Sequence, residues 1–197
     1  MNAIITKLSK VAIASKKKYP EEIEDIILFG SLVKGKSEPK DIDILIIFKE
    51  KVIKEIEYSF RQLLPDKASV ISKTKKTLFD ASFDAREGVL FEGYSLIDLD
   101  YVGSRYGFQS WGLFLYETKG ISNNTKTRFY YALNGRGDQK GISKKFRCIK
   151  LSDRAILVPL EQIEPMKEFF NYWNIEYKPI PSLIPSRLSR EDIIAKS

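Results

Sequence analysis

Two aspartates and a Gly-Ser pair are the residues in this chain whose types and spacing best fit a chemical reaction. Gly30-Ser31 follows one apolar run, and Asp41-Ile42-Asp43 leads into a second. Alternate residues of a strand point to the same face, so Asp41 and Asp43 are predicted to lie side by side. Two carboxylates at that separation repel each other unless a cation lies between them. Mg²⁺ or Mn²⁺ bound by oxygen ligands removes this conflict, and Mg²⁺ is usual where phosphates are handled.

The Gly-Ser pair is predicted to supply the phosphate-binding half of such a site. Gly30 has no Cβ atom, so the backbone can approach a ligand closely. Ser31 is expected to open a helical turn whose free N–H groups favour a phosphate. Lys34, with Lys40 as a further candidate, adds a cation to the same segment. The plainer alternative is a turn followed by two solvated aspartates, but aspartate is depleted in strands.

The elements that would position these residues can be read from the apolar pattern. Branched apolar runs at residues 26–29 and 44–48 predict two buried strands on either side of the Gly-Ser segment. A third strand is predicted at 68–72, and helices at 3–18, 50–64 and 78–90. Strands and helices in this order predict a small mixed α/β fold.

The segment from Gly30 to Asp43 resembles a known signature. Gly30-Ser31, nine intervening residues and Asp41-Ile42-Asp43 are similar to the motif of the DNA polymerase beta-type nucleotidyltransferase superfamily, and of its minimal nucleotidyltransferases in particular. The resemblance covers about residues 20–100. It implies a palm domain that transfers a nucleoside monophosphate from an NTP, ATP included, to a hydroxyl-type acceptor. Gly30, Ser31 and Lys34 would then bind the nucleotide, and Asp41 and Asp43 would be the catalytic ligands of Mg²⁺ or Mn²⁺.

The resemblance also extends to the end of the palm and shows one departure. The run from Glu87 to Tyr94 resembles the helix-to-strand ending of minimal nucleotidyltransferases. In that family the segment packs against the palm, which implies a structural and not a catalytic role for Glu87. The family usually has a third carboxylate on its third strand, and the corresponding place here falls near Ser69. Without it the metal loses a ligand and the attacking hydroxyl loses a base. The candidate substitutes are Asp66, Asp80 and Asp84.

Composition excludes several other chemistries. The chain has 197 residues and no histidine, which excludes His-based zinc sites, Ser-His-Asp hydrolysis and Cys-His catalysis. The single cysteine, Cys148, cannot form an internal disulfide and favours a reducing compartment, which predicts a cytoplasmic protein. No apolar run approaches the roughly 20 residues of a membrane span, so no membrane partner is expected.

The net charge of +7 is concentrated in residues 119–154, which hold ten Lys and Arg against two Asp and Glu. This excess predicts an anionic partner, RNA or DNA, for the second half of the chain. The expected phosphate contacts are Lys126, Arg128, Arg136, Lys140, Lys144, Lys145 and Arg147. Phe129, Tyr130 and Tyr131 would either stack on unpaired bases or belong to the core. The cations would otherwise only solvate one face.

The predicted organisation has two domains. A nucleotidyltransferase palm covers residues 1–100, a linker 101–108, a basic accessory α/β domain 109–185 and a polar tail 186–197. Within the second domain, 110–116 is a strand or a helix, 135–141 a flexible loop and 175–184 an extended segment. Helices are expected at 125–134 and 159–173, with a strand at 155–158 between them. Two functions remain open: a nucleotidyltransferase, or a catalytically impaired relative that binds nucleotides or nucleic acid.

Overall fold

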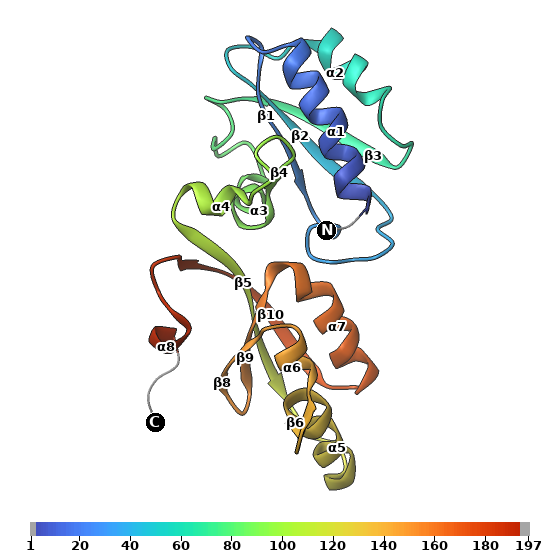
Figure 1. The fold of residues 1–197 in the computed structure, drawn as a ribbon, viewed down its shortest axis with the longest axis vertical. Helices are drawn as coiled ribbons and strands as arrows, with labels where there is room; N and C mark the ends of the chain where they lie inside the picture. Colours follow the sequence, from blue (N-terminus) through green and yellow to red (C-terminus); the bar gives the residue numbers. More distant parts are fainter. Residues whose placement is uncertain (1–2, 194–197) are drawn as a thin grey trace. The chain divides into compact units, whose positions relative to one another are not determined.

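The chain forms two compact units, residues 1–106 and 107–197, in a computed structural model that describes residues 3–193 (Figure 1). Each unit contains a four-stranded sheet with helices packed beside it. The predicted fold class, a mixed-sheet palm followed by a second small α/β module, is confirmed. Among residues 3–193, no helix combines the length and the apolar character needed to cross a membrane.

The sheet of the first unit has the strand order β3-β2-β1-β4. Its members are β1 (Ile23–Phe29), β2 (Ile42–Phe48), β3 (Ala68–Thr74) and β4 (Tyr94–Ser95). β2 runs antiparallel to β1 and parallel to β3, so the sheet is mixed. Strands β1 and β2 are buried almost continuously, because their runs of Ile, Leu and Phe are covered on both faces.

The helices of the first unit cover this sheet. They are α1 (Ala3–Lys18), α2 (Lys54–Arg61), α3 (Arg86–Glu92) and α4 (Val102–Arg105). α1 presents Leu8 and Ala12 to the core, as its amphipathic pattern predicts, and it contacts β1. The predicted helix at 78–90 is wrong for residues 78–85, which form turns. Directly before this segment, Thr74 at the end of β3 and Thr77 bond each other's backbone and side chains, and such local bonds compete with helix formation.

The predicted linker at 101–108 contains a packed segment. Residues 102–105 form α4, with Val102 and Gly103 buried. Arg105 links this segment to the sheet, because its guanidinium forms an ion pair at 2.6 Å with the buried carboxylate of Asp25 on β1. The same carboxylate accepts hydrogen bonds from the Ile26 N–H and the Ser95 hydroxyl. The boundary between the two compact units therefore falls after this network, at Tyr106.

The sheet of the second unit has the order β10-β5-β9-β8 and is antiparallel throughout. Its members are β5 (Phe108–Glu117), β8 (Ile149–Ser152), β9 (Ala155–Pro159) and β10 (Glu176–Pro185). The segment left open between strand and helix, 110–116, is thus a strand. β10 pairs with β5 along its whole length, although it contains Pro179, Pro181 and Pro185.

The helices of the second unit are α5 (Asn123–Asn134), α6 (Ile142–Lys145), α7 (Ile163–Tyr172) and α8 (Arg190–Ile193). α5 begins at Asn123, two residues before the predicted start, because Ser122 caps it: the Ser122 side chain accepts a hydrogen bond from the Thr125 N–H. The predicted helix at 159–173 is α-helical only from Ile163, after the 3₁₀ turn Leu160–Gln162. The predicted tail contains α8, and residues 194–197 of that tail lie outside the described residues.

Residues 135–141 form a hairpin, so their prediction as a flexible loop is wrong. β6 (Gly135–Arg136) pairs with β7 (Gln139–Lys140) through the two-residue connection Gly137-Asp138. Two-residue connections of Gly and Asp are typical of tight hairpins, because glycine accepts the left-handed backbone that they need. Gly137 has a φ of 54°.

Aromatic side chains form the core of the second unit. Phe114 and Tyr116 on β5 pack on Phe170 of α7 and, for Tyr116, on Phe129 of α5, with ring centroids 5.1–5.9 Å apart. Phe129 and Phe170 are completely buried. Phe129 is therefore a core residue, as one of the two alternatives for the aromatic run predicts, and it is not available for stacking on bases.

Candidate active site

The Gly30-Ser31 pair forms a tight turn directly after β1. Gly30 has a φ of +87°, and a Cβ atom at this position would lie 2.8 Å from Oδ2 of Asp43. The Lys34 N–H donates to the Gly30 carbonyl at 3.4 Å, and the Lys36 N–H donates to the Ser31 carbonyl at 3.0 Å. Ser31 thus opens a short turn, and the turn does not continue into a regular helix. The turn therefore brings the backbone of Gly30 close to the carboxylate of Asp43.

Asp43 lies on β2, and Asp41 lies just before this strand. β2 begins at Ile42, so only Asp43 has the strand geometry that was predicted for both aspartates. Asp43 pairs in register with Phe29 of β1 and with Ser69 of β3, while Ile42 and Ile44 are buried. The strand therefore fixes Asp43 at the end of β1, next to the Gly30 turn. Asp41 is exposed in the preceding loop and acts on Asp43 through its charge.

Glu92, at the end of α3, is a site residue that sequence reasoning missed. Its Oε1 accepts a hydrogen bond from the Gly30 N–H at 2.9 Å. Its Oε2 pairs with Nζ of Lys34 at 2.8 Å, and the side chains of Glu92 and Lys34 are only 13% and 23% exposed. One signal was available: Glu92 follows the buried Val89 by three residues, so both lie on the same side of a helix.

The site carries more negative than positive charge. The pKa of Asp43 is raised above its ordinary value, first by burial and then by the neighbouring carboxylates of Asp41 and Glu92. Lys34 opposes this increase. Because like charges flank Asp43, a bound cation in addition to Lys34 would stabilise its ionised carboxylate.

The third strand has a hydroxyl side chain, that of Ser69, next to Asp43. Ser69 is the residue of β3 that pairs in register with Asp43. Asp66 lies in the turn in which the Ala68 N–H donates to the Pro65 carbonyl. Asp80 and Asp84 lie in the turns between β3 and α3. The carboxylate that acts on Asp43 besides Asp41 is Glu92.

The donor set fits a magnesium ion that is shared with a phosphate ligand. Within residues 3–193, no three His, Cys, Asp or Glu side chains form a closed metal cluster. Mg²⁺ in nucleotide sites is usually held by one or two carboxylates, with substrate phosphates and water completing its shell. Asp41 and Asp43 are two such carboxylates, and the absence of a Cβ atom at Gly30 leaves Asp43 unobstructed.

The seven cations predicted to bind nucleic acid are all exposed in the second unit. They lie on α5, on the β6-β7 hairpin, on α6 and just after it: Lys126, Arg128, Arg136, Lys140, Lys144, Lys145 and Arg147. The guanidinium of Arg136 lies 4.8 Å from the ring centre of Tyr131, which is 43% exposed. Arg147 pairs with Glu161 at 3.3 Å. Of the three aromatic candidates, Tyr131 is the exposed one and Tyr130 is half-buried.

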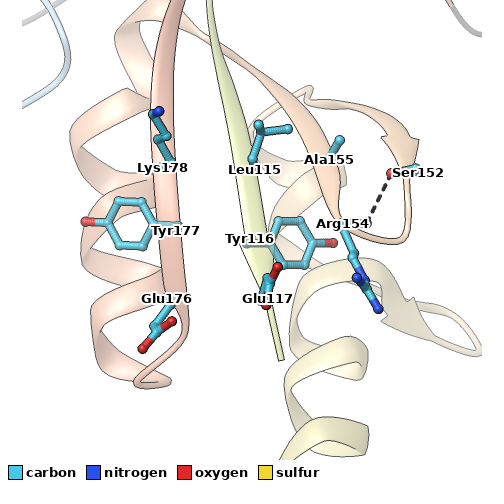
Figure 2. A pocket seen from close by; sticks show the side chains of 9 residues that line it. All are labelled: Leu115, Tyr116, Glu117, Ser152, Arg154, Ala155, Glu176, Tyr177 and Lys178. Atoms are coloured by element: carbon cyan, nitrogen blue, oxygen red, sulfur yellow. Dashed lines mark hydrogen bonds between the residues drawn. The ribbon is translucent and has the colours of Figure 1, made fainter. Parts of the chain in front are cut away.

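The second unit also contains a cavity of about 470 Å³ beside the pairing of β5, β9 and β10. Figure 2 shows its lining, in which the rings of Tyr116 and Tyr177 lie among the acidic and basic side chains of Glu117, Glu176 and Arg154. The Tyr116 hydroxyl is buried and has no hydrogen-bond partner among the described residues. Burial raises the pKa of Tyr116, so the phenol stays neutral at physiological pH.

These features define a nucleotidyltransferase palm: a mixed sheet, a Gly-Ser turn after its first strand, and an Asp-x-Asp segment leading into its second. Residues 11–92 match the family model of the polymerase beta nucleotidyltransferase domain. The chain therefore contains a domain of the polymerase beta-type nucleotidyltransferase superfamily, within its first unit. A search of curated proteins finds no match to this chain.

Proposed function

We propose that the chain is a nucleotidyltransferase that moves a nucleoside monophosphate from an NTP, ATP among the candidates, to a hydroxyl-type acceptor. The observation that carries this proposal is the position of the Gly30 turn against the carboxylate of Asp43. It supports the proposal because a backbone proposed to bind phosphate then lies next to a side chain proposed to bind a cation. The match of residues 11–92 to the nucleotidyltransferase family model supports the same reaction class.

The residues of the site divide the work as follows. Gly30 and Ser31 bind the β- and γ-phosphates through backbone N–H groups, and Lys34 adds a positive charge. Asp41 and Asp43 hold Mg²⁺ or Mn²⁺. When bound, this ion supplies charge neutralisation at the α-phosphate and at the leaving group. The acceptor hydroxyl oxygen bonds to the α-phosphorus and its proton passes to water. The bond between the α-phosphorus and the oxygen that bridges to the β-phosphate breaks, and pyrophosphate leaves with that electron pair.

Incubation with each α-³²P-labelled NTP and Mg²⁺ or Mn²⁺ tests this proposal. Total RNA, DNA and the protein itself are offered as acceptors, because the class of acceptor is open. Asp41→Ala and Asp43→Ala are each expected to reduce label transfer by at least about 100-fold, since each removes a ligand of the proposed cation. Asp138→Ala, at an exposed aspartate of the β6-β7 hairpin, removes the same charge outside the first unit and serves as the control that should retain transfer. Unchanged transfer in Asp41→Ala would contradict the assignment.

A second candidate function is a catalytically impaired palm that binds nucleotide or nucleic acid. The observation that favours it is Ser69, a hydroxyl, at the β3 position opposite Asp43. Mg-NTP binding by a protein that transfers no label would support this candidate. The exposed cations of the second unit are then the proposed contacts for RNA or DNA phosphates.

A reducing, cytoplasmic location is proposed as well. Its support is Cys148, the one cysteine of the chain, which is buried and free. Burial raises the pKa of its thiol to about 12, so the sulfur stays protonated and unreactive.

A further inference from the structure

We propose that Glu92 occupies the phosphate-binding donors of the free protein, and that a nucleotide must displace this carboxylate to bind. The inference rests on the proposed function, because it takes Gly30 and Lys34 as donors to nucleotide phosphates. It adds a carboxylate, outside the Gly-Ser and Asp-x-Asp motifs, that competes with the nucleotide phosphates for the same donors.

The contacts of Glu92 are those that a phosphate group would make. One carboxylate oxygen accepts the Gly30 N–H at 2.9 Å, and the other pairs with the Lys34 ammonium at 2.8 Å. A backbone N–H and an ammonium that converge on two oxygens of one anion form a charge-assisted pair of bonds. Since neither side chain is more than 23% exposed, water and salt screen this contact only in part.

The position of Glu92 relative to Asp43 couples phosphate binding to cation binding. Glu92 is one of the charges that act on Asp43. While Lys34 pairs with Glu92, its positive charge compensates that carboxylate. A phosphate that takes Lys34 leaves Glu92 without this partner and adds negative charge beside Asp43. Phosphate binding without a divalent cation is therefore weak, and part of that weakness comes from Glu92.

A purely structural role for Glu92 predicts a different result. If the carboxylate only braces the Gly30 turn, removing its charge leaves phosphate binding unchanged or weakens it, because no competitor is removed. Glu92→Gln separates the two roles, because the amide oxygen can still accept the Gly30 N–H while the ion pair with Lys34 is broken. Glu87→Gln is the matched control: Glu87 is exposed on the same helix, and its substitution removes the same charge.

Isothermal titration of the 197-residue chain with sodium tripolyphosphate in EDTA tests the inference. Glu92→Gln is expected to bind about fivefold more tightly than the unmodified protein, the equivalent of one partly exposed ion pair. Glu87→Gln should change the affinity by less than about twofold. Equal or weaker binding by Glu92→Gln would overturn the inference while leaving the proposed function intact. No binding by any of the three proteins would overturn both the inference and the assignment of the Gly30 turn to phosphates.

A second measurement needs no variant and so does not depend on how Glu92→Gln folds. The ¹³C signal of the Glu92 side-chain carboxylate is followed by NMR as tripolyphosphate is added to the unmodified protein. Displacement predicts a shift that saturates together with the shift of the Gly30 amide. A Glu92 signal that stays fixed while the Gly30 amide saturates would overturn the inference.

Discussion

Gly30 lies so close to Asp43 that a Cβ atom at position 30 would come 2.8 Å from Oδ2 of the aspartate. The Gly-Ser turn and the Asp-x-Asp segment are thus parts of one contact and not two independent motifs. The turn needs glycine for two separate reasons, its φ of +87° and the carboxylate beside it.

Gly30→Ala is expected to lower both stability and nucleotide transfer. A left-handed backbone costs a non-glycine residue about 1–2 kcal/mol, and the added methyl group would displace the Asp43 carboxylate. Gly120→Ala is the matched control, because Gly120 has a φ of +84° but a Cβ atom there would meet no other residue within 4 Å. Urea unfolding and label transfer are measured on both. Transfer that falls equally in the two variants would show that the contact with Asp43 does not matter.

Asp43→Asn should stabilise the protein in EDTA at neutral pH. The pKa of Asp43 is raised in the folded state, so the native protein binds its proton more readily than the unfolded chain does. Ionised Asp43 therefore costs stability above its folded-state pKa, and this cost disappears as the pH falls through that pKa toward the unfolded value. Thermal unfolding from about pH 4 to pH 8 should show a gain of a few degrees at neutral pH that vanishes in acid. A gain independent of pH would contradict this explanation.

Arg105→Met should destabilise the first unit by about 2–3 kcal/mol. The substitution leaves the 5%-exposed carboxylate of Asp25 without its cation, and an unpaired buried charge is costly. The expected loss is below that for a fully buried pair because Arg105 is 35% exposed. Lys75→Met is the control, since it breaks the exposed pair with Glu24 and should have a much smaller effect. Chemical denaturation measures both, and equal losses would exclude a special role for Asp25.

Replacing Arg136, Lys144 and Lys145 with Gln should weaken RNA binding and flatten its salt dependence. Each cation that no longer neutralises a phosphate of a single strand reduces the slope of log K against log salt by about 0.7, so three such cations reduce it by about 2. Lys7, Lys10 and Lys17 on α1 are exposed as well, and their triple replacement removes the same charge. Fluorescence anisotropy with labelled single-stranded RNA compares the two. The same slope in both triple variants would exclude the second unit as the RNA-binding surface.

The palm could be predicted in outline because its signals are local. The apolar runs around Gly30 and Asp43 specify strands by themselves, and the parallel strand that follows places Ser69 opposite Asp43. Glu92 could not be found in this way. Its contact with Gly30 joins residues 62 positions apart, and neither the Gly-Ser motif nor the run from Glu87 to Tyr94 indicates that the two residues meet.

The second unit was harder to read for a physical reason. The aromatic residues of β5 fit a strand or a helix equally well, and the choice depends on β10, a pairing strand that lies far along the chain. Around Gly137, the same glycines that suggest a flexible loop also allow a two-residue hairpin. Phe129 and Tyr131 are near neighbours on one helix, yet Phe129 is buried against Tyr116 of β5 and Tyr131 is exposed. The sequence alone does not indicate which face of this helix meets β5.

The prolines of β10 limit the hydrogen-bond donors at the edge of the second sheet. Pro179, Pro181 and Pro185 are separated by two or four residues, so they share one side of an outermost strand that still pairs fully with β5. Alternate residues direct their amide positions to the same side, so the missing N–H groups are those that would face outward. A foreign strand approaching this edge finds carbonyl acceptors but few donors. The edge is thereby protected from adding further strands, which is how many soluble β-sheets avoid fibrillar self-association.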